Sequence, residues 1–176
     1  MSVSPLLTKA RIIELLEALD AALAAQAVAG ELYLVGGAVM CLVFESRPAT
    51  RDLDAWFAPS TEMRRAAATV AQAYDLPPQW LNDAVKGMLA QTGEFSPFWE
   101  REHLKVFTAV PEYLLAMKCL SMRLGPEFFD LDDVRYLLRY LNIETYEQAV
   151  AVVTRYYPAK RIPSKTLYAL EELLGA

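Results

Sequence analysis

The chain has few of the residues on which many enzymes depend. Its 176 residues include a single histidine, His103, and two cysteines, Cys41 and Cys119. The cysteines lie far apart in apolar surroundings, so we expect buried thiols and neither a zinc site nor a disulfide framework. With one imidazole, which we expect to be structural, a histidine–nucleophile pair is disfavoured. The chain also lacks a Gly-x-x-x-x-Gly-Lys-Ser/Thr loop, which argues against a kinase-like phosphotransferase.

Long apolar runs and excess positive charge are missing as well. No apolar run reaches the roughly 18 residues of a membrane helix, and the first five residues lack the basic region of a secretion signal. We therefore expect a cytoplasmic protein without a membrane segment. Seventeen Lys and Arg against 22 Asp and Glu give a net charge of −5, which disfavours broad electrostatic binding to nucleic acid. The 55% apolar content indicates a packed globular chain.

The order of apolar segments and breaks predicts an α/β (α+β) fold, with a small mixed sheet flanked by helices and a helical C-terminal half. We expect an α/β core over residues 1–109 and a helical lobe over 110–176. The expected elements are a helix opening at Ser4-Pro5, a strand over 32–35, a helix over 37–44, a strand over 53–57, a helix from about 60 to 74, a shorter helix over 81–90, a loop over 93–97 and a strand over 103–108.

The segment Leu32–Phe57 has the most specific pattern. An apolar strand ends at Gly36-Gly37, and a second strand carries Asp52-Leu53-Asp54. Alternation along a strand puts both aspartates on one face. Two carboxylates this close repel one another unless a cation lies between them, and Mg²⁺, with Mn²⁺ as an alternative, prefers carboxylate and phosphate oxygens. Asp52 and Asp54 are therefore candidate metal ligands.

Four further residues of this segment are suited to phosphate. Gly36 and Gly37 lie where a strand passes into a helix, so backbone N–H groups there can approach an anion. Arg47 and Thr50 precede the aspartates and could donate to the same phosphates. Gly-Gly alone is often only a turn, and Asp-x-Asp occurs on many solvated strand ends. Together they indicate a nucleotide site.

The residues Gly36-Gly37 followed by Arg47-x-x-Thr50-x-Asp52-Leu53-Asp54 resemble the signature of the DNA polymerase β-like nucleotidyltransferase superfamily. The similarity is to its small bacterial members related to abortive-infection and toxin–antitoxin nucleotidyltransferases. The helical segment around Lys118, followed by an acidic helix start at Asp130, Asp132 and Asp133, is similar to the helical part of the same group. With both pieces the resemblance covers about two-thirds of the chain.

The resemblance implies a Mg²⁺-dependent transfer of a nucleoside monophosphate from an NTP to a hydroxyl of an RNA end or a protein. It implies catalytic roles for Asp52, Asp54 and Lys118, with Lys118 contacting the triphosphate. It also implies a pocket role for Asp133, although helix capping explains at least one of the three acids. For Lys118 the alternative is a solvated helix-face residue. A toxin-like role with a cognate antitoxin-type partner follows from the same resemblance.

The chain departs from the family pattern at the third carboxylate. Polymerase-like transfer usually has another acid on a neighbouring strand to activate the attacking hydroxyl. The strand around Leu104–Thr108 has none, and only Glu100 and Glu102 lie just before it. The alternative function is therefore a catalytically inactive nucleotide-binding or protein-interaction module of the same fold.

A basic cluster near the C-terminus is a further candidate. Its charged residues alternate with aromatic ones and could hold a triphosphate tail or an RNA end. Solvated lysines at a helix–helix connection explain it better. The cluster consists of Arg155, Lys160, Arg161 and Lys165, with Tyr156 and Tyr157.

Overall fold

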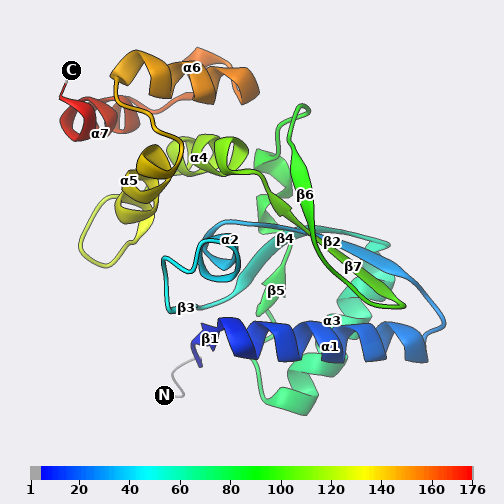
Figure 1. Cartoon of the computed structure of the whole chain (residues 1–176). Coiled ribbons are helices and arrows are strands. Elements are labelled where there is room, and N and C mark those ends of the chain that lie inside the picture. Colours follow the sequence, from blue (N-terminus) through cyan, green and yellow to red (C-terminus); the bar gives the residue numbers. More distant parts are fainter. Residues whose placement is uncertain (1–4, 176) are drawn as a thin grey trace. The chain divides into compact units, whose positions relative to one another are not determined.

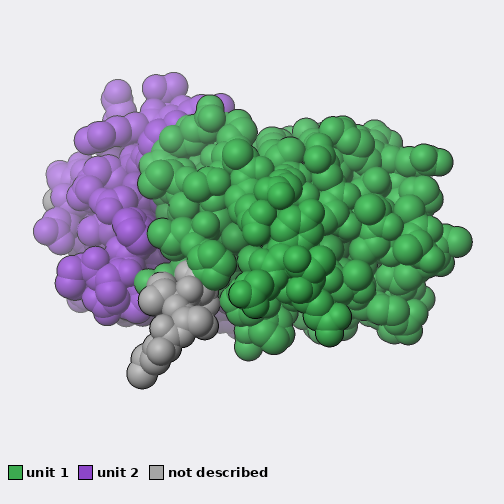
Figure 2. Space-filling view, turned by 90° about the horizontal axis from the view of Figure 1, so that it is seen from below, with its two compact units in different colours: residues 1–87, 95–108 green, residues 88–94, 109–176 purple. Residues whose placement is uncertain are grey.

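The computed structural model describes residues 5–175, which fold into two compact units (Figures 1 and 2). Unit 1 comprises residues 5–87 and 95–108, and unit 2 comprises 88–94 and 109–175. The mixed α/β content predicted from the sequence is confirmed, with a five-stranded mixed sheet, a two-stranded sheet and seven α-helices in the described residues. The segment 88–94, assigned to the core from the sequence, groups with the helical unit.

Unit 1 is built on the five-stranded sheet, whose strand order is β5-β4-β2-β7-β6. Strand β2 pairs antiparallel with β4 and parallel with β7, and β4 pairs parallel with β5. The strands are β2 (Gly30–Val35), β4 (Leu53–Ala58), β5 (Leu81–Asn82), β6 (Phe95–Glu100) and β7 (Leu104–Ala109).

Helices α1 (Lys9–Ala25) and α3 (Ser60–Tyr74) cover one face of this sheet (Figure 1). Alternate residues of β4, namely Leu53, Ala55 and Phe57, are buried, as the alternation predicted. Burial of such side chains is the main favourable contribution to folding. Asp54, which lies between them in the sequence, is half-buried and belongs to the opposite face.

The first helix begins later than the sequence suggested. Pro5 is not helical, and Ser4 lies outside the described residues. Instead β1 (Leu7–Thr8) pairs antiparallel with β3 (Ala49–Thr50), and α1 begins at Lys9. The hydroxyl of Thr8 accepts a hydrogen bond from the backbone N–H of Arg11 at 3.2 Å, so Thr8 is the N-cap.

The segment after Pro78 was also predicted wrongly. In place of a helix over 81–90 there are the two-residue strand β5 and a 3₁₀ helix, Ala84–Met88. The expected loop over 93–97 is largely strand β6. A proline usually indicates a break in a strand, because it has no N–H to donate to a neighbouring strand. Strand β6 accommodates Pro97 because it lies at the edge of the sheet, where one side of the strand has no neighbour.

Unit 2 is helical, with α4 starting at a proline and α6 starting at a capping box of Thr145 and Gln148. None of the helices in residues 5–175 has the length and apolarity needed to cross a lipid bilayer. The α-helices are α4 (Pro111–Leu120), α5 (Asp130–Tyr140), α6 (Tyr146–Tyr156) and α7 (Ser164–Leu174).

Candidate functional site

The turn between β2 and α2 (Gly37–Leu42) places a glycine directly against an aspartate. Gly36 has φ 67° and ψ −149°, a conformation open essentially only to glycine. A Cβ added at Gly36 would lie 3.5 Å from Oδ2 of Asp54. The register explains the contact, because Val35 and Asp54 are partners in the β2–β4 ladder. The predicted phosphate turn and the predicted metal ligand are therefore neighbours.

Gly37 faces the two predicted donors. A Cβ added there would collide with the guanidinium of Arg47 and would lie 3.1 Å from the hydroxyl of Thr50. The β1–β3 pairing holds Thr50 in place opposite Leu7. Its side chain is buried, and its hydroxyl donates to the backbone carbonyl of Asp52 at 3.3 Å. We call Gly36, Gly37, Arg47, Thr50, Asp52 and Asp54 the glycine–aspartate site.

The electrostatics of this site combine one cation with two carboxylates. Burial raises the pKa of the Cys41 thiol on α2, and the positive charges of Arg47 and Lys9 partly oppose this effect. Arg47, Asp52 and Asp54 all interact with other groups of the protein. Both aspartates are nevertheless half-buried rather than enclosed. Each of the two aspartates is therefore partly exposed to solvent.

A metal ion would find two protein carboxylates here. Among the described residues no group of three or more His, Cys, Asp or Glu side chains is placed to hold a metal. Mg²⁺ is often bound through one or two carboxylates together with substrate phosphates and water. Asp54 lies next to Gly36 and fits that requirement. Asp52 precedes β4, which begins at Leu53, so strand alternation does not place it on the face of Asp54 as the sequence suggested; it is half-buried, and its backbone carbonyl accepts a hydrogen bond from Thr50.

The acids suggested as a third carboxylate do not lie near this site. Glu100 and Glu102 precede Leu104, which pairs with Gly30 at the start of β2, whereas Asp54 pairs with Val35 at its end. Five residues of strand separate those positions by about 17 Å. The side chain of Glu100 is exposed and pairs with Lys105 at 3.7 Å.

The strand neighbour of Asp54 on its other side carries an amide. Asn82 of β5 is the partner of Asp54, and sequence reasoning missed it because a two-residue strand has no readable periodicity. Its side chain donates to the carbonyl of Gln79 and accepts from the N–H of Ala84. The following acid, Asp83, is engaged in ion pairs with Arg64 and Lys86.

Lys118 and Asp133 form a separate buried cluster in unit 2. The Lys118 ammonium lies 2.6 Å from Oδ2 of Asp133 and 3.4 Å from Oδ1 of Asp130. These three side chains are almost fully buried, so Lys118 is not the solvated helix-face residue of the alternative interpretation. The backbone N–H and the guanidinium of Arg123 donate hydrogen bonds to the carboxylate of Asp130. We call these four residues the lysine cluster.

Asp130 and Asp132 differ in their surroundings. Burial opposes ionisation of Asp130, but the hydrogen bonds from Arg123 and the charge of Lys118 outweigh it and hold its pKa below the ordinary value. Asp132 is exposed and pairs with Arg135 one turn along α5. No side chain caps the start of α5, so capping does not account for the buried acids.

The aromatic residues of the C-terminal basic cluster are used in packing. Tyr156 and Tyr157 are buried, and their hydroxyls donate to Glu94 and to the carbonyl of Met88. Arg155 and Arg161 lie over these rings, at 5.6 and 5.3 Å from the centroids. The arrangement is consistent with the structural explanation favoured from the sequence.

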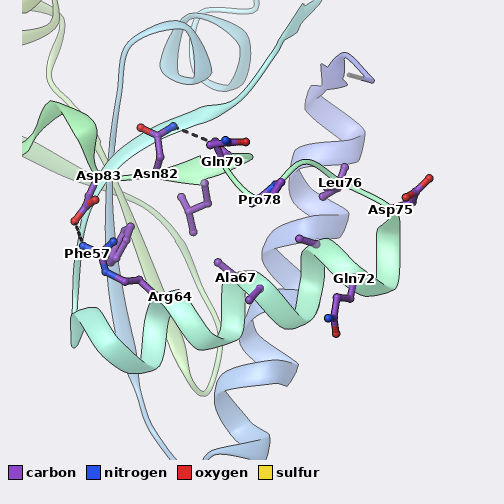
Figure 3. A pocket seen from close by; sticks show the side chains of 13 residues that line it. Phe57, Arg64, Ala67, Gln72, Asp75, Leu76, Pro78, Gln79, Asn82 and Asp83 are labelled. Carbon is purple, nitrogen blue, oxygen red and sulfur yellow. Dashed lines mark hydrogen bonds and ion pairs between the residues drawn. The ribbon is translucent and has the colours of Figure 1, made fainter. Parts of the chain in front are cut away.

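Unit 1 also has a groove of about 660 Å³ beside α3 and β5 (Figure 3). Its walls are largely apolar, with Phe57, Ala67 and Leu81, and the Arg64–Asp83 pair lies at one end. None of the residues of the glycine–aspartate site lines it.

The comparisons with known proteins identify no family. No family model, no curated protein and no solved structure matches the chain. Function must therefore be argued from the residues and their geometry.

Proposed function

We propose that the protein is a Mg²⁺-dependent nucleotidyltransferase that transfers a nucleoside monophosphate from an NTP to a hydroxyl of an RNA end or a protein. The observation that carries the proposal is the contact of Gly36 with Asp54 beside the Gly37–Arg47–Thr50 contact. The residues proposed as phosphate donors and Asp54, a proposed metal ligand, lie at one strand-to-helix turn.

Each residue of the site has a separate task in this proposal. Asp52 and Asp54 hold the metal, and the backbone of Gly36 and Gly37 approaches the phosphates. The Arg47 guanidinium neutralises charge that develops on them, and the Thr50 hydroxyl orients them. A bound Mg²⁺ would supply Lewis-acid polarisation of the phosphoryl oxygens.

The reaction forms one phosphorus–oxygen bond and breaks another. The acceptor oxygen attacks the α-phosphorus, and the bond from the α-phosphorus to the bridging oxygen breaks, so that pyrophosphate leaves. The acceptor proton passes to solvent water in our scheme, since the strand neighbour of Asp54 is Asn82 and carries no carboxylate. We therefore expect slow turnover compared with an enzyme that has a positioned base.

The proposal leaves Lys118 and Asp133 with the roles that the resemblance implies, a triphosphate contact and a pocket member. A cytoplasmic location, where NTPs are available, and an antitoxin-type protein as regulatory partner belong to the same proposal. The pairing of Lys118 with Asp133 gives both residues a structural task as well.

A catalytically inactive nucleotide-binding or interaction module is the second candidate. It is favoured by Asn82 next to Asp54 and by the distant positions of Glu100 and Glu102. Such a module would bind Mg²⁺–NTP at the same residues without turnover.

The test is Mg²⁺-dependent incorporation of label from each α-labelled NTP into total RNA and total protein. The wild type is compared with Asp52→Ala/Asp54→Ala and with a control, Asp132→Ala, which removes an exposed acid of unit 2. If the wild type and the control incorporate label and the double variant does not, the result supports the nucleotidyltransferase and identifies the base of the NTP and the class of acceptor. Retained NTP binding without label supports the module, and equal labelling by the double variant contradicts the proposed site.

A further inference from the structure

Three aromatic residues follow one side of helix α5 in unit 2. Phe129, Tyr136 and Tyr140 are separated by seven and four residues, a spacing that puts side chains on one face of a helix. The backbone carbonyl of Phe129 accepts a hydrogen bond from the N–H of Asp133 at 2.9 Å, so Phe129 continues the helical pattern. The rings of Tyr136 and Tyr140 are stacked, with centroids 6.4 Å apart. We call Phe129, Tyr136 and Tyr140 the α5 stripe.

The α5 stripe lies largely in solvent. Phe129 is 55% exposed and Tyr140 is 54% exposed, while Tyr136 is half-buried. Among the described residues α5 packs mainly on α4, and it turns a different side, with Val134 and Leu137, into the core of unit 2. Exposed apolar side chains that occur singly are normal, whereas adjacent ones mark interaction surfaces. The stripe is therefore a candidate contact surface for another molecule.

The exposed charges beside the stripe differ in sign between the two ends of α5. Asp132 lies in the first turn and Arg139 in the last turn, and both are exposed. They are seven residues apart, so they share one side of the helix at a separation of about 10 Å. If two copies of α5 pack antiparallel, the acid of each copy meets the arginine of the other, and this contact occurs twice.

We propose that the α5 stripe is the contact surface of a homodimer in which the α5 helices of two copies pack antiparallel about a two-fold axis near Tyr136. A two-fold interface uses the same surface on both copies, so the surface must be complementary to itself. The α5 surface meets this condition through its opposite charges at Asp132 and Arg139 and through its central tyrosine rings. Aromatic residues and arginine are also the types enriched at protein interfaces.

A second copy fits this surface better than a polyanion does. The exposed charged residues of α5 are one acid, Asp132, and two arginines, Arg135 and Arg139. A polyanion would be repelled at Asp132 and by the net charge of −5. The stripe covers about 16 Å of helix, so we expect a small contact area and a weak dimer. The stripe contains no residue of the glycine–aspartate site, so this inference does not depend on the proposed function.

The experiment measures self-association of the full chain by sedimentation velocity between about 1 and 300 µM. Arg139→Glu places like charges opposite one another at both contacts, and so does Asp132→Arg. Each variant should therefore raise the dimer Kd at least about tenfold. An equimolar mixture of the two variants restores both opposite-charge contacts and should associate as the wild type does. Lys165→Glu, which reverses an exposed charge on α7, is the control and should stay within about twofold of wild type.

A second pair of variants tests the aromatic part of the surface. Tyr140→Ala should raise the dimer Kd about 5- to 50-fold, whereas Tyr168→Ala, which removes a 71% exposed ring on α7, should leave it within about twofold. Circular dichroism checks that each variant is folded.

The results decide the inference in either direction. Loss of the dimer in Arg139→Glu and its return in the mixture with Asp132→Arg support the α5 contact, whether or not the chain transfers nucleotides. A monomeric wild type at every concentration would overturn it. Undiminished association of folded Arg139→Glu, or no association in the mixture, would overturn it as well.

Discussion

The glycine–aspartate site of unit 1 and the lysine cluster of unit 2 contain similar charges in different settings. In the first, the carboxylates of Asp52 and Asp54 are half-buried, and Asp54 lies beside Gly36. In the second, Asp133, Asp130 and Lys118 are buried and satisfy one another. In the first arrangement the carboxylates are less buried than in the second.

The comparison shows why charge pattern alone is a weak guide to function. A buried ion pair holds its helices in one arrangement, and removing one partner leaves an uncompensated charge. The aspartates of the glycine–aspartate site are only half-buried, so a change there leaves less charge uncompensated in the interior. We therefore expect variants of the lysine cluster to affect stability most, and variants of the glycine–aspartate site to affect turnover most.

The largest effect is expected for Lys118→Ala. It removes the ammonium that pairs with the buried carboxylates of Asp133 and Asp130, of which Asp130 keeps Arg123, and should lower the free energy of unfolding by about 3–5 kcal/mol. Urea denaturation measures this. The control Lys160→Ala removes an exposed lysine and should change stability by less than about 0.5 kcal/mol. A stable Lys118→Ala protein that has lost NTP affinity would contradict the structural task of Lys118 and leave it with the proposed triphosphate contact alone.

Asp54→Asn should act on turnover with little effect on folding. The amide keeps the shape next to Gly36 but loses the charge that holds the metal, so we expect a drop in kcat of about 10²–10³-fold. Initial rates of NMP transfer at saturating Mg²⁺–NTP measure it. Asp132→Asn serves as a matched exposed control. Full activity in Asp54→Asn would show that the pair is not the metal site.

Gly37→Ala tests the close approach of Arg47 and Thr50 to the glycine turn of unit 1. The added methyl meets the Arg47 guanidinium and the Thr50 hydroxyl, so the end of the flexible Arg47 side chain must move away and the hydroxyl must shift by a small amount. Both are proposed phosphate donors, so calorimetry should show weaker NTP binding. Gly87→Ala is the control, because a Cβ there meets nothing within 4 Å. Similar behaviour of the two variants would argue against a tight contact at Gly37.

The smallest effect is expected for acid pH. The pKa of Asp130 is depressed in the folded chain, so its stabilising contribution is present above the unfolded value of about 4 and is lost as pH falls through the folded value. Denaturation between pH 6 and pH 3 should show a stability loss below about pH 4. Asp130→Asn should flatten that part of the profile, and an unchanged slope would contradict the role of Asp130.

Strong local patterns allowed much of unit 1 to be predicted from the sequence. The Gly-Gly break between apolar segments and the alternation around Asp54 located β2, α2 and β4 correctly to within two residues at each end. The start of the first helix was missed because β1 is defined by its pairing with β3, a contact between residues about 40 positions apart. Strand β6 was missed because Pro97 suggests a break unless the strand is known to lie at an edge.

The candidate site was predictable to a similar extent. The strand-turn-helix pattern correctly brought Gly36, Gly37, Arg47, Thr50 and Asp54 into one neighbourhood. Sequence could not show that Lys118 pairs with Asp133, since the pairing depends on how α4 and α5 pack. It could not show that Trp56, Phe107 and Phe95 pack on Tyr33 either, because these residues come from four strands whose order is a tertiary property.

The most direct test of the account is calorimetric titration of a non-hydrolysable NTP, with and without Mg²⁺, into the wild type and the folded Asp52→Asn/Asp54→Asn variant. The account predicts Mg²⁺-dependent binding to one site in the wild type and its loss in the variant. Equal Mg²⁺-dependent binding by both proteins, or no binding to the wild type, would contradict the assignment of the glycine–aspartate site.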